Sequence, residues 1–209
     1  MREKIIVSLL SPGGLSLKES VGRWLKEGSE LRLKMAETMS AEIVSAATAI
    51  AETFKAGGKL LLFGNGGSAA DAQHIAAEFM NRFLIERPPL PAIALTTDTS
   101  VLTSIANDYS FDEIFSKQVK ALGKKGDVAL GITTSGSSGN VLKALRAAKK
   151  LGMTTIALTG EGGKAASLSD IALQIPSRST PRIQEAHIAV GHILCDLTDT
   201  ILFKDVGKR

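Results

Sequence analysis

Two pairs of titratable residues in this chain are spaced for proton transfer. His74 and Glu78 are four residues apart and share one face if their segment is helical. Glu185 and His192 are seven residues apart in a later helical segment and again fall nearly on one face. Moving a proton between adjacent carbons requires one group that removes it and another that handles the carbonyl and hydroxyl protons. Glu78 and His192 are the natural pair for this chemistry, whereas His187 is expected to be a partly buried structural residue.

Two loops have compositions suited to binding an anion. Residues 64–68 (Gly-Asn-Gly-Gly-Ser) follow an apolar run and precede a helix, so their backbone N–H groups can converge on an anion at the helix N-terminus. In residues 133–138 every position except Gly136 carries a hydroxyl, more than the single one that a helix cap uses. The first loop matches neither the Walker nor the dinucleotide pattern, so nucleotide binding is not expected. A phosphorylated ligand is therefore predicted.

The elements that must position these residues alternate between strand and helix. Short apolar runs predict strands at residues 60–63, 92–96, 128–132, 155–159 and 171–175. Helices are predicted at residues 69–83, 100–105, 112–122, 140–151, 163–168 and 182–203. Fully apolar strands alternating with helices are typical of a parallel sheet covered on both faces. The predicted fold is an α/β three-layer sandwich with a five-stranded parallel sheet, and both loops lie at its carboxyl edge, where open α/β folds bind ligands.

The N-terminal part of the chain follows a different pattern. An approximate helical stripe from residue 18 to about residue 56, interrupted near Gly28 and Ser29, predicts two amphipathic helices. Residues 1–17 fit this pattern poorly and are interpreted as an extension, an edge element or an oligomer contact. No linker rich in Pro, Gly or Ser divides the rest, so residues 18–209 are predicted to form a single domain.

The composition excludes several classes of protein. The net charge of +4 arises from 25 basic and 21 acidic residues scattered along the chain, which argues against nucleic acid as a partner. The apolar run at residues 5–10 is too short for a membrane span or an export signal, so we expect no membrane contact and a cytoplasmic location. Cys195 is the only cysteine, which excludes an intrachain disulfide, and is expected to be a small core residue.

Several motifs, in this order along the chain, resemble the phosphoheptose isomerase family of sugar isomerase (SIS) domains. They are residues 64–68, His74 with Glu78, residues 95–98, residues 105–109, residues 133–138, and residues 180–185 with His192. The similarity runs from about residue 20 to residue 203. The resemblance implies a flavodoxin-like SIS fold and a homotetramer with composite active sites.

The same resemblance implies the reaction and the role of each site residue. The expected activity is interconversion of sedoheptulose 7-phosphate and D-glycero-D-manno-heptose 7-phosphate, an early step toward the heptose of lipopolysaccharide or other surface glycans. Glu78 would remove the carbon-bound proton, with His192 as partner acid/base through an enediol. Ser68, Thr133, Ser135 and Ser138 would hold the phosphate. The full set of implied substrate contacts is Asn65, Gly66, Gly67, Ser68, Glu78, Asp98, Thr133, Thr134, Ser135, Ser138 and Gln184.

Some members of the family bind zinc, and the resemblance carries their ligands to His74, Glu78, Gln184 and His192. Imidazole and carboxylate are ordinary zinc ligands, whereas an amide is less usual. Gln184 and His192 are separated by about 12 Å along one helix. They can share a metal only if the helix starts late, their side chains converge, or different subunits contribute them. One zinc ion per subunit is expected.

Two other functions are compatible with the same fold. Residues 81–88 and 90–95 also resemble the non-catalytic SIS protein that associates with the bacterial replication initiator. That adaptor is expected to lack part of the catalytic constellation, which this chain has at Glu78 and His192. A regulatory sugar-phosphate sensor would need the hydroxyl loop but neither of those two residues. The isomerase is therefore the favoured prediction.

Overall fold

A five-stranded parallel sheet forms the middle of the molecule. The computed structural model describes residues 14–204, in which the strand order is β2-β1-β3-β4-β5. The strands are β1 (Leu60–Gly64), β2 (Ala92–Ala94), β3 (Val128–Thr133), β4 (Thr154–Thr159) and β5 (Ile171–Gln174). Every neighbouring pair is parallel, as predicted. The five predicted strands are confirmed, with ends shifted by at most two residues.

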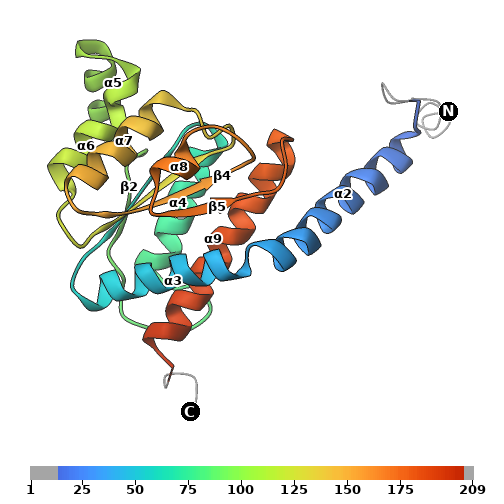
Figure 1. Cartoon of the computed structure of the whole chain (residues 1–209), viewed down its shortest axis with the longest axis horizontal. Helices are drawn as coiled ribbons and strands as arrows, with labels where there is room; N and C mark the ends of the chain where they lie inside the picture. The colour runs from blue at the N-terminus through green and yellow to red at the C-terminus, as the bar shows by residue number, and fades with distance from the viewer. Residues whose placement is uncertain (1–13, 205–209) are drawn as a thin grey trace, which may run out of the picture.

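Helices cover both faces of the sheet (Figure 1). They are α2 (Leu17–Thr38), α3 (Ser40–Lys55), α4 (Gly67–Met80), α5 (Thr99–Asp108), α6 (Ile114–Leu122), α7 (Gly139–Lys150), α8 (Ala165–Leu168) and α9 (Thr180–Leu202), with a 3-10 turn at Phe111–Glu113. Side chains alternate along each strand, so Leu60 and Leu62 pack with α3, α4 and α9, while Leu61 and Phe63 pack with α6, α7 and α8. The three-layer sandwich is confirmed. No helix within residues 14–204 has the length and apolar character needed to cross a membrane.

The strand order brings the two predicted anion loops together. β1 and β3 are neighbours in the middle of the sheet, but α4, which follows β1, packs on one face and α7, which follows β3, packs on the other. Open α/β sheets bind ligands in a crevice at the carboxyl edge, where successive connections leave to opposite faces. The position between these two loops is called the crevice below. The order β2-β1-β3-β4-β5 is that of flavodoxin-like folds.

The predicted break near Gly28 and Ser29 is wrong, because α2 continues through both residues and ends at Thr38. A Cβ atom at position 28 would lie 3.1 Å from Arg182 Nη1 and 3.3 Å from Glu185 Oε2. Gly28 therefore makes room for side chains of α9 rather than ending a helix. Of the predicted extension, residues 1–13 lie outside the described residues, and Leu17 already belongs to α2.

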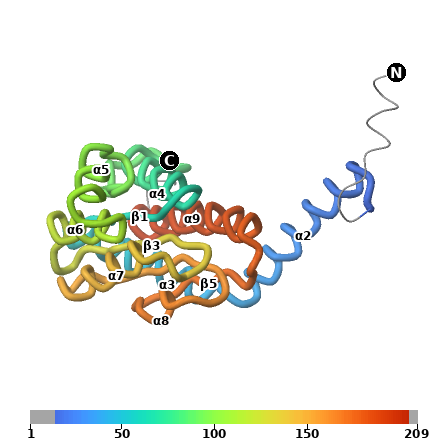
Figure 2. Tube along the Cα trace, turned by 90° about the horizontal axis from the view of Figure 1, so that it is seen from above, coloured from blue at the N-terminus to red at the C-terminus, as the bar shows by residue number. Residues whose placement is uncertain are grey.

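Most of α2 projects from the body of the molecule, as Figures 1 and 2 both show. Its contact with α9 is made by Arg182, whose Nη1 donates to the Trp24 carbonyl oxygen at 2.9 Å. The same guanidinium lies 4.0 Å from the centre of the Trp24 ring, within the range of a cation–π interaction. One buried arginine of α9 thus fixes the direction in which α2 leaves the domain.

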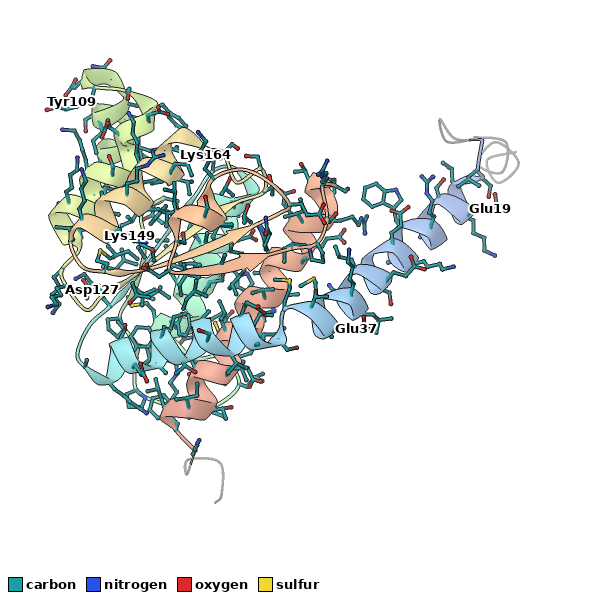
Figure 3. The ribbon with its side chains drawn as sticks, in the orientation of Figure 1. Glu19, Glu37, Tyr109, Asp127, Lys149 and Lys164 are labelled. Carbon is teal, nitrogen blue, oxygen red and sulfur yellow. The ribbon has the colours of Figure 1, made fainter. Side chains whose placement is uncertain are left out.

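A buried ion pair joins the starts of the two central strands. The Asp127 side chain is fully buried and accepts hydrogen bonds from the backbone N–H groups of Lys59 and Lys124. Lys59 Nζ donates to the same carboxylate at 2.6 Å. Figure 3 shows Asp127 at the end of the domain away from α2, so this pair lies at the amino edge of the sheet, opposite the crevice.

His187 is fully buried in α9, and neither ring nitrogen has a hydrogen-bond partner among residues 14–204. Burial lowers the pKa of His187 to about 4, against a smaller opposing effect of the Thr159 backbone. The folded protein therefore holds this imidazole neutral, which agrees with its predicted structural role, but the prediction that His187 is only partly buried is wrong.

We expect His187 to make the protein less stable in mild acid. Its pKa is lowered from 6.5 to about 4 on folding, so between these values the unfolded chain binds a proton that the folded chain does not. Lowering the pH from 7 to 4.5 should reduce the free energy of unfolding by about 2 kcal/mol through this residue. Urea unfolding of wild type and His187→Leu at both pH values measures this decrease. An equal decrease in the free energy of unfolding of the two proteins would contradict the lowered pKa of His187.

Candidate active site

The loop between β1 and α4 forms one side of the crevice. Gly66 has a φ of +55°, a left-handed conformation that favours glycine, and α4 begins at the next residue. Ser68 is buried within the first turn of α4. A Cβ atom on Gly67 would lie 2.5 Å from Gln184 Nε2, so this glycine lets the Gln184 amide reach the start of α4. Three predicted residues, Gly67, Ser68 and Gln184, therefore lie together.

The loop between β3 and α7 forms the other side and carries a cluster of hydroxyl groups. Thr133 Oγ1 lies 2.9 Å from Ser138 Oγ and 3.5 Å from Ser135 Oγ. Thr133 is buried, Thr134 is half-buried and Ser135 is exposed, so the cluster opens toward solvent. Because α7 begins at Gly139, the hydroxyls stand at the positive end of a helix, where an anion is stabilised.

A pair of asparagines joins the two loops. Asn65 Nδ2 donates to Asn140 Oδ1 at 2.9 Å, and Asn140 Nδ2 donates back to Asn65 Oδ1 at 2.8 Å. Asn140 is buried in the first turn of α7. The amide of Asn65, predicted to orient the sugar, is therefore engaged in holding the crevice together. The role of Asn140 was not predicted. In the sequence it is an ordinary residue at the start of a helix, and only the fold brings it next to Asn65.

Three of the predicted titratable residues form a chain of contacts between α4 and α9. His74 Nε2 lies 3.2 Å from Glu78 Oε1 and 3.1 Å from His192 Nε2. The Phe83 ring stacks at 5.3 Å from the imidazole of His192. The predicted catalytic residues Glu78 and His192 are thus linked through His74, which can pass or hold a proton between them.

The two helices can approach this closely because α9 has a glycine at the contact. A Cβ atom at Gly191 would lie 2.6 Å from Ile75 Cδ1, too near for any side chain without movement. Gly191 precedes His192 and Ile75 follows His74, so the close approach occurs at the two histidines. The absence of a side chain at Gly191 therefore explains both the close packing of the two helices and the short contact between the histidines.

The predicted site falls into two parts within one chain. Gly67 and Glu78 are eleven residues apart on α4, about 16 Å along the helix axis. Gln184 lies at the loop end, and His192 lies about 12 Å farther along α9. The structure therefore brings Gln184 to Gly67 and does not bring it to His192. The Asp98 carboxylate accepts a hydrogen bond from Val101 N–H at 3.0 Å and caps α5.

Asp71 is a further titratable residue at this surface that the prediction of the site did not include. It lies on α4 one turn before His74, and its Oδ2 has no hydrogen-bond partner among the described residues. Burial raises the pKa of Asp71 to about 6, with His74 opposing the shift. The spacing of Asp71 and His74, one helical turn apart, is visible in the sequence and could have identified Asp71 as a candidate site residue.

The predicted zinc ligands are only partly assembled in one chain. The contacts among His74, Glu78 and His192 are close to the roughly 3.3 Å that separates donors bound tetrahedrally at zinc distances. Within residues 14–204, however, no three His, Cys, Asp or Glu side chains are grouped as a metal ion requires. The donor types suit zinc, but the single chain lacks a complete site.

Comparison with known proteins identifies the family. The SIS domain family model matches residues 23–160. The phosphoheptose isomerase of Nitratidesulfovibrio vulgaris is 54% identical over 181 residues, which cover 86% of this chain and 87% of that protein. That of Thermodesulfovibrio yellowstonii is 61% identical over 163 residues, covering 78% of this chain and 81% of that protein.

Solved structures agree with these sequence relatives. The phosphoheptose isomerase of Neisseria gonorrhoeae is 46% identical with a TM-score of 0.83, over 88% of this chain and 99% of that one. The enzyme of Francisella tularensis is 41% identical with a TM-score of 0.84, over 87% and 97% of the two chains. This chain belongs to the phosphoheptose isomerase family of SIS-domain proteins.

Proposed function

We propose that this protein is an aldose–ketose isomerase that interconverts sedoheptulose 7-phosphate and D-glycero-D-manno-heptose 7-phosphate. The observation that carries the proposal is the contact chain from Glu78 through His74 to His192, in a chain more than half identical to several phosphoheptose isomerases. A sugar phosphate as substrate also accords with the predicted cytoplasmic location.

The chemistry requires one proton to move between two carbons. The Glu78 carboxylate removes a proton from C1 of the ketose while O2 gains a proton, which gives the enediol. Returning a proton to C2 and removing the proton from O1 then gives the aldose. His192 is suited to the oxygen-bound protons because imidazole can both donate and accept near neutral pH. The overall reaction consumes no oxidant, reductant or water.

The substrate phosphate is proposed to bind in the crevice between the β1–α4 and β3–α7 loops. The clustered hydroxyls of Thr133, Ser135 and Ser138 offer several donors, and the starts of α4 and α7 add backbone N–H groups. A sugar phosphate has no base, so its binding requires no aromatic stacking residue and no nucleotide-binding motif.

The relatives favour the isomerase over the adaptor that binds the replication initiator. The relatives that match at 50 to 61% identity over most of the chain are phosphoheptose isomerases. The proposed catalytic pair, Glu78 on α4 and His192 on α9, supports the same choice, because an adaptor or a sensor would not need both residues.

Replacing the base should remove turnover without removing substrate binding. In Glu78→Gln the amide keeps the shape of the side chain but cannot accept the carbon-bound proton, so kcat should fall by roughly 10²- to 10⁴-fold. Conversion of sedoheptulose 7-phosphate followed by NMR measures turnover, and calorimetry measures binding. Glu86→Gln, at a carboxylate that is exposed and paired with Arg82, is the matched control. Normal turnover by Glu78→Gln would show that the base is another residue.

We further propose one zinc ion per subunit, held by His74, Glu78 and His192 of one chain, with Gln184 supplied by a neighbouring copy. Bound there, zinc would act as a Lewis acid that polarises the substrate carbonyl. The support is the donor types and the 3.1 Å and 3.2 Å contacts among the three side chains. The distance of Gln184 from His192 along α9 is the reason for assigning it to a neighbour.

Zinc binding should depend on His74 more strongly than on Gln184. Removing an imidazole leaves two donors from the same chain, whereas removing the amide leaves three. Calorimetric titration of the metal-free protein with zinc should give a much weaker Kd for His74→Ala than for Gln184→Ala. Undiminished zinc binding by both variants would place the zinc site elsewhere, and no binding by wild type would refute the proposed zinc ion.

A homotetramer with shared sites is proposed for the same reason. The two parts of the site lie about 16 Å apart along α4, and a second copy can bring a complementary part to each. α2 and the start of α9 line a groove of about 1030 Å³, and α2 exposes apolar residues there, among them Leu25 at 73%. A second groove of about 650 Å³ includes His192 itself. Unpaired apolar surface next to a catalytic residue fits burial by another copy.

A charge in the α2 groove should break the assembly and the activity together. Leu25→Glu places a carboxylate on the surface that a second copy would bury, so the molar mass from light scattering should fall. Lys34→Glu, exposed on the same helix and not lining the groove, is the control and should keep the wild-type mass. A monomeric and fully active wild type would refute the shared site.

A further inference from the structure

Arg87 is a buried arginine that the proposed chemistry does not use. Its side chain has no exposed surface, and it lies in the loop that leads from α4 to β2. Its guanidinium donates hydrogen bonds to groups on two different helices. The same loop contains Pro88, Pro89 and Pro91, and Arg87 ties it to both helices.

The first group of contacts is at the C-terminal end of α4. Arg87 Nη2 donates to the carbonyl oxygen of Glu78 at 2.9 Å, and Nη1 donates to that of Phe79 at 2.6 Å. Nη1 is also 3.3 Å from the carbonyl oxygen of Asn81, the residue that ends the helix. The last carbonyls of a helix have no partner within it and carry partial negative charge. Arg87 therefore caps the end of α4, including the backbone of the proposed base.

The second contact is on α9. Arg87 Nε donates to Asp199 Oδ1 at 2.8 Å, and the Asp199 side chain is 5% exposed. Asp199 lies seven residues after His192, about two turns farther along the same face of α9. The planar guanidinium can hold carbonyl and carboxylate acceptors at once, in fixed directions, which an ammonium group cannot.

α4 and α9 are therefore joined at two levels. The first is the contact of His74 with His192, where Gly191 admits Ile75. The second is the set of hydrogen bonds from Arg87. These reach α4 about one turn beyond His74 and α9 about two turns beyond His192. Apolar side chains of α4, among them Ile75 and Phe79, also pack in the core, but apolar contacts have no preferred direction. Arg87 adds hydrogen bonds of fixed direction at the C-terminal end of α4.

We propose that Arg87 is a positioning residue that holds the end of α4 on α9 and so sets the Glu78 carboxylate relative to His192. This proposal rests on the proposed function, in which those two side chains transfer the protons. Displacement of a catalytic group by about 1 Å can cost roughly 100-fold in rate. Loss of Arg87 acts on the chemical step, since the two phosphate-binding loops lie at the other end of α4.

The test compares Arg87→Met with Asp127→Asn. Both substitutions break a buried ion pair, but the hydrogen bonds of Asp127 go to Lys59 and Lys124 at the starts of β1 and β3, and none goes to α4 or α9. Both proteins should lose thermal stability. Only Arg87→Met should lose kcat, by at least tenfold, with KM within twofold of wild type. Asp127→Asn should keep kcat within twofold.

Arg87→Lys is the second variant, in case Arg87→Met does not fold. Its ammonium keeps the charge and can satisfy some acceptors but not all, so kcat should lie between those of wild type and Arg87→Met. Rates of Arg87→Met and Arg87→Lys equal to that of Asp127→Asn, after correction for the folded fraction, would overturn the proposal.

A second readout does not depend on activity. The δ1 methyl group of Ile75 lies over Gly191, so the nuclear Overhauser effect between them reports the packing of α4 on α9. It should weaken in Arg87→Lys and stay unchanged in Asp127→Asn. If wild type converts no sugar phosphate, the proposed function fails, and this signal alone decides the positioning role. An unchanged signal in Arg87→Lys would refute it.

Discussion

The close packing of α4 on α9 is the contact on which the candidate site depends. Each helix carries part of the titratable cluster, and neither part is useful without the other. The helices meet at Gly191, where the absence of a side chain lets Ile75 approach and lets His74 reach His192. A glycine inside a helix lowers its intrinsic stability by roughly 0.5 to 1 kcal/mol relative to alanine. That cost is offset by the close packing of the two helices.

A second constraint is the order of the strands. Because β1 and β3 are neighbours whose helices leave to opposite faces, the two anion loops meet at the centre of the carboxyl edge. The paired amides of Asn65 and Asn140 hold the loops at that meeting point. The crevice and the titratable cluster then lie at different levels of α4. A single chain thus presents two partial sites, which is the structural argument for sharing them between copies.

The sequence predicted the layers and the strands, and indicated the candidate site residues, because those features have short-range signals. Apolar runs of strand length and helical spacing are local, and so are the glycine and hydroxyl loops. The error at Gly28 has the opposite origin: the reason for that glycine is Arg182, which lies more than 150 residues away in the sequence. The roles of Asn140 and Arg87 were not predicted for the same reason: their partners are known only once the chain is folded.

The position of α9 has a consequence for how the protein is made. α9 is synthesised after all other elements within residues 14–204, yet it packs on α3 and α4, which are synthesised early. Until residues 180–202 have left the ribosome, the sides of α3 and α4 that face α9 have no partner, although both helices already have strands to pack on. Contacts between segments so distant in sequence form slowly, and exposed apolar surface in the meantime favours aggregation. Completion of the last helix is therefore the step that covers the sides of α3 and α4 that face α9.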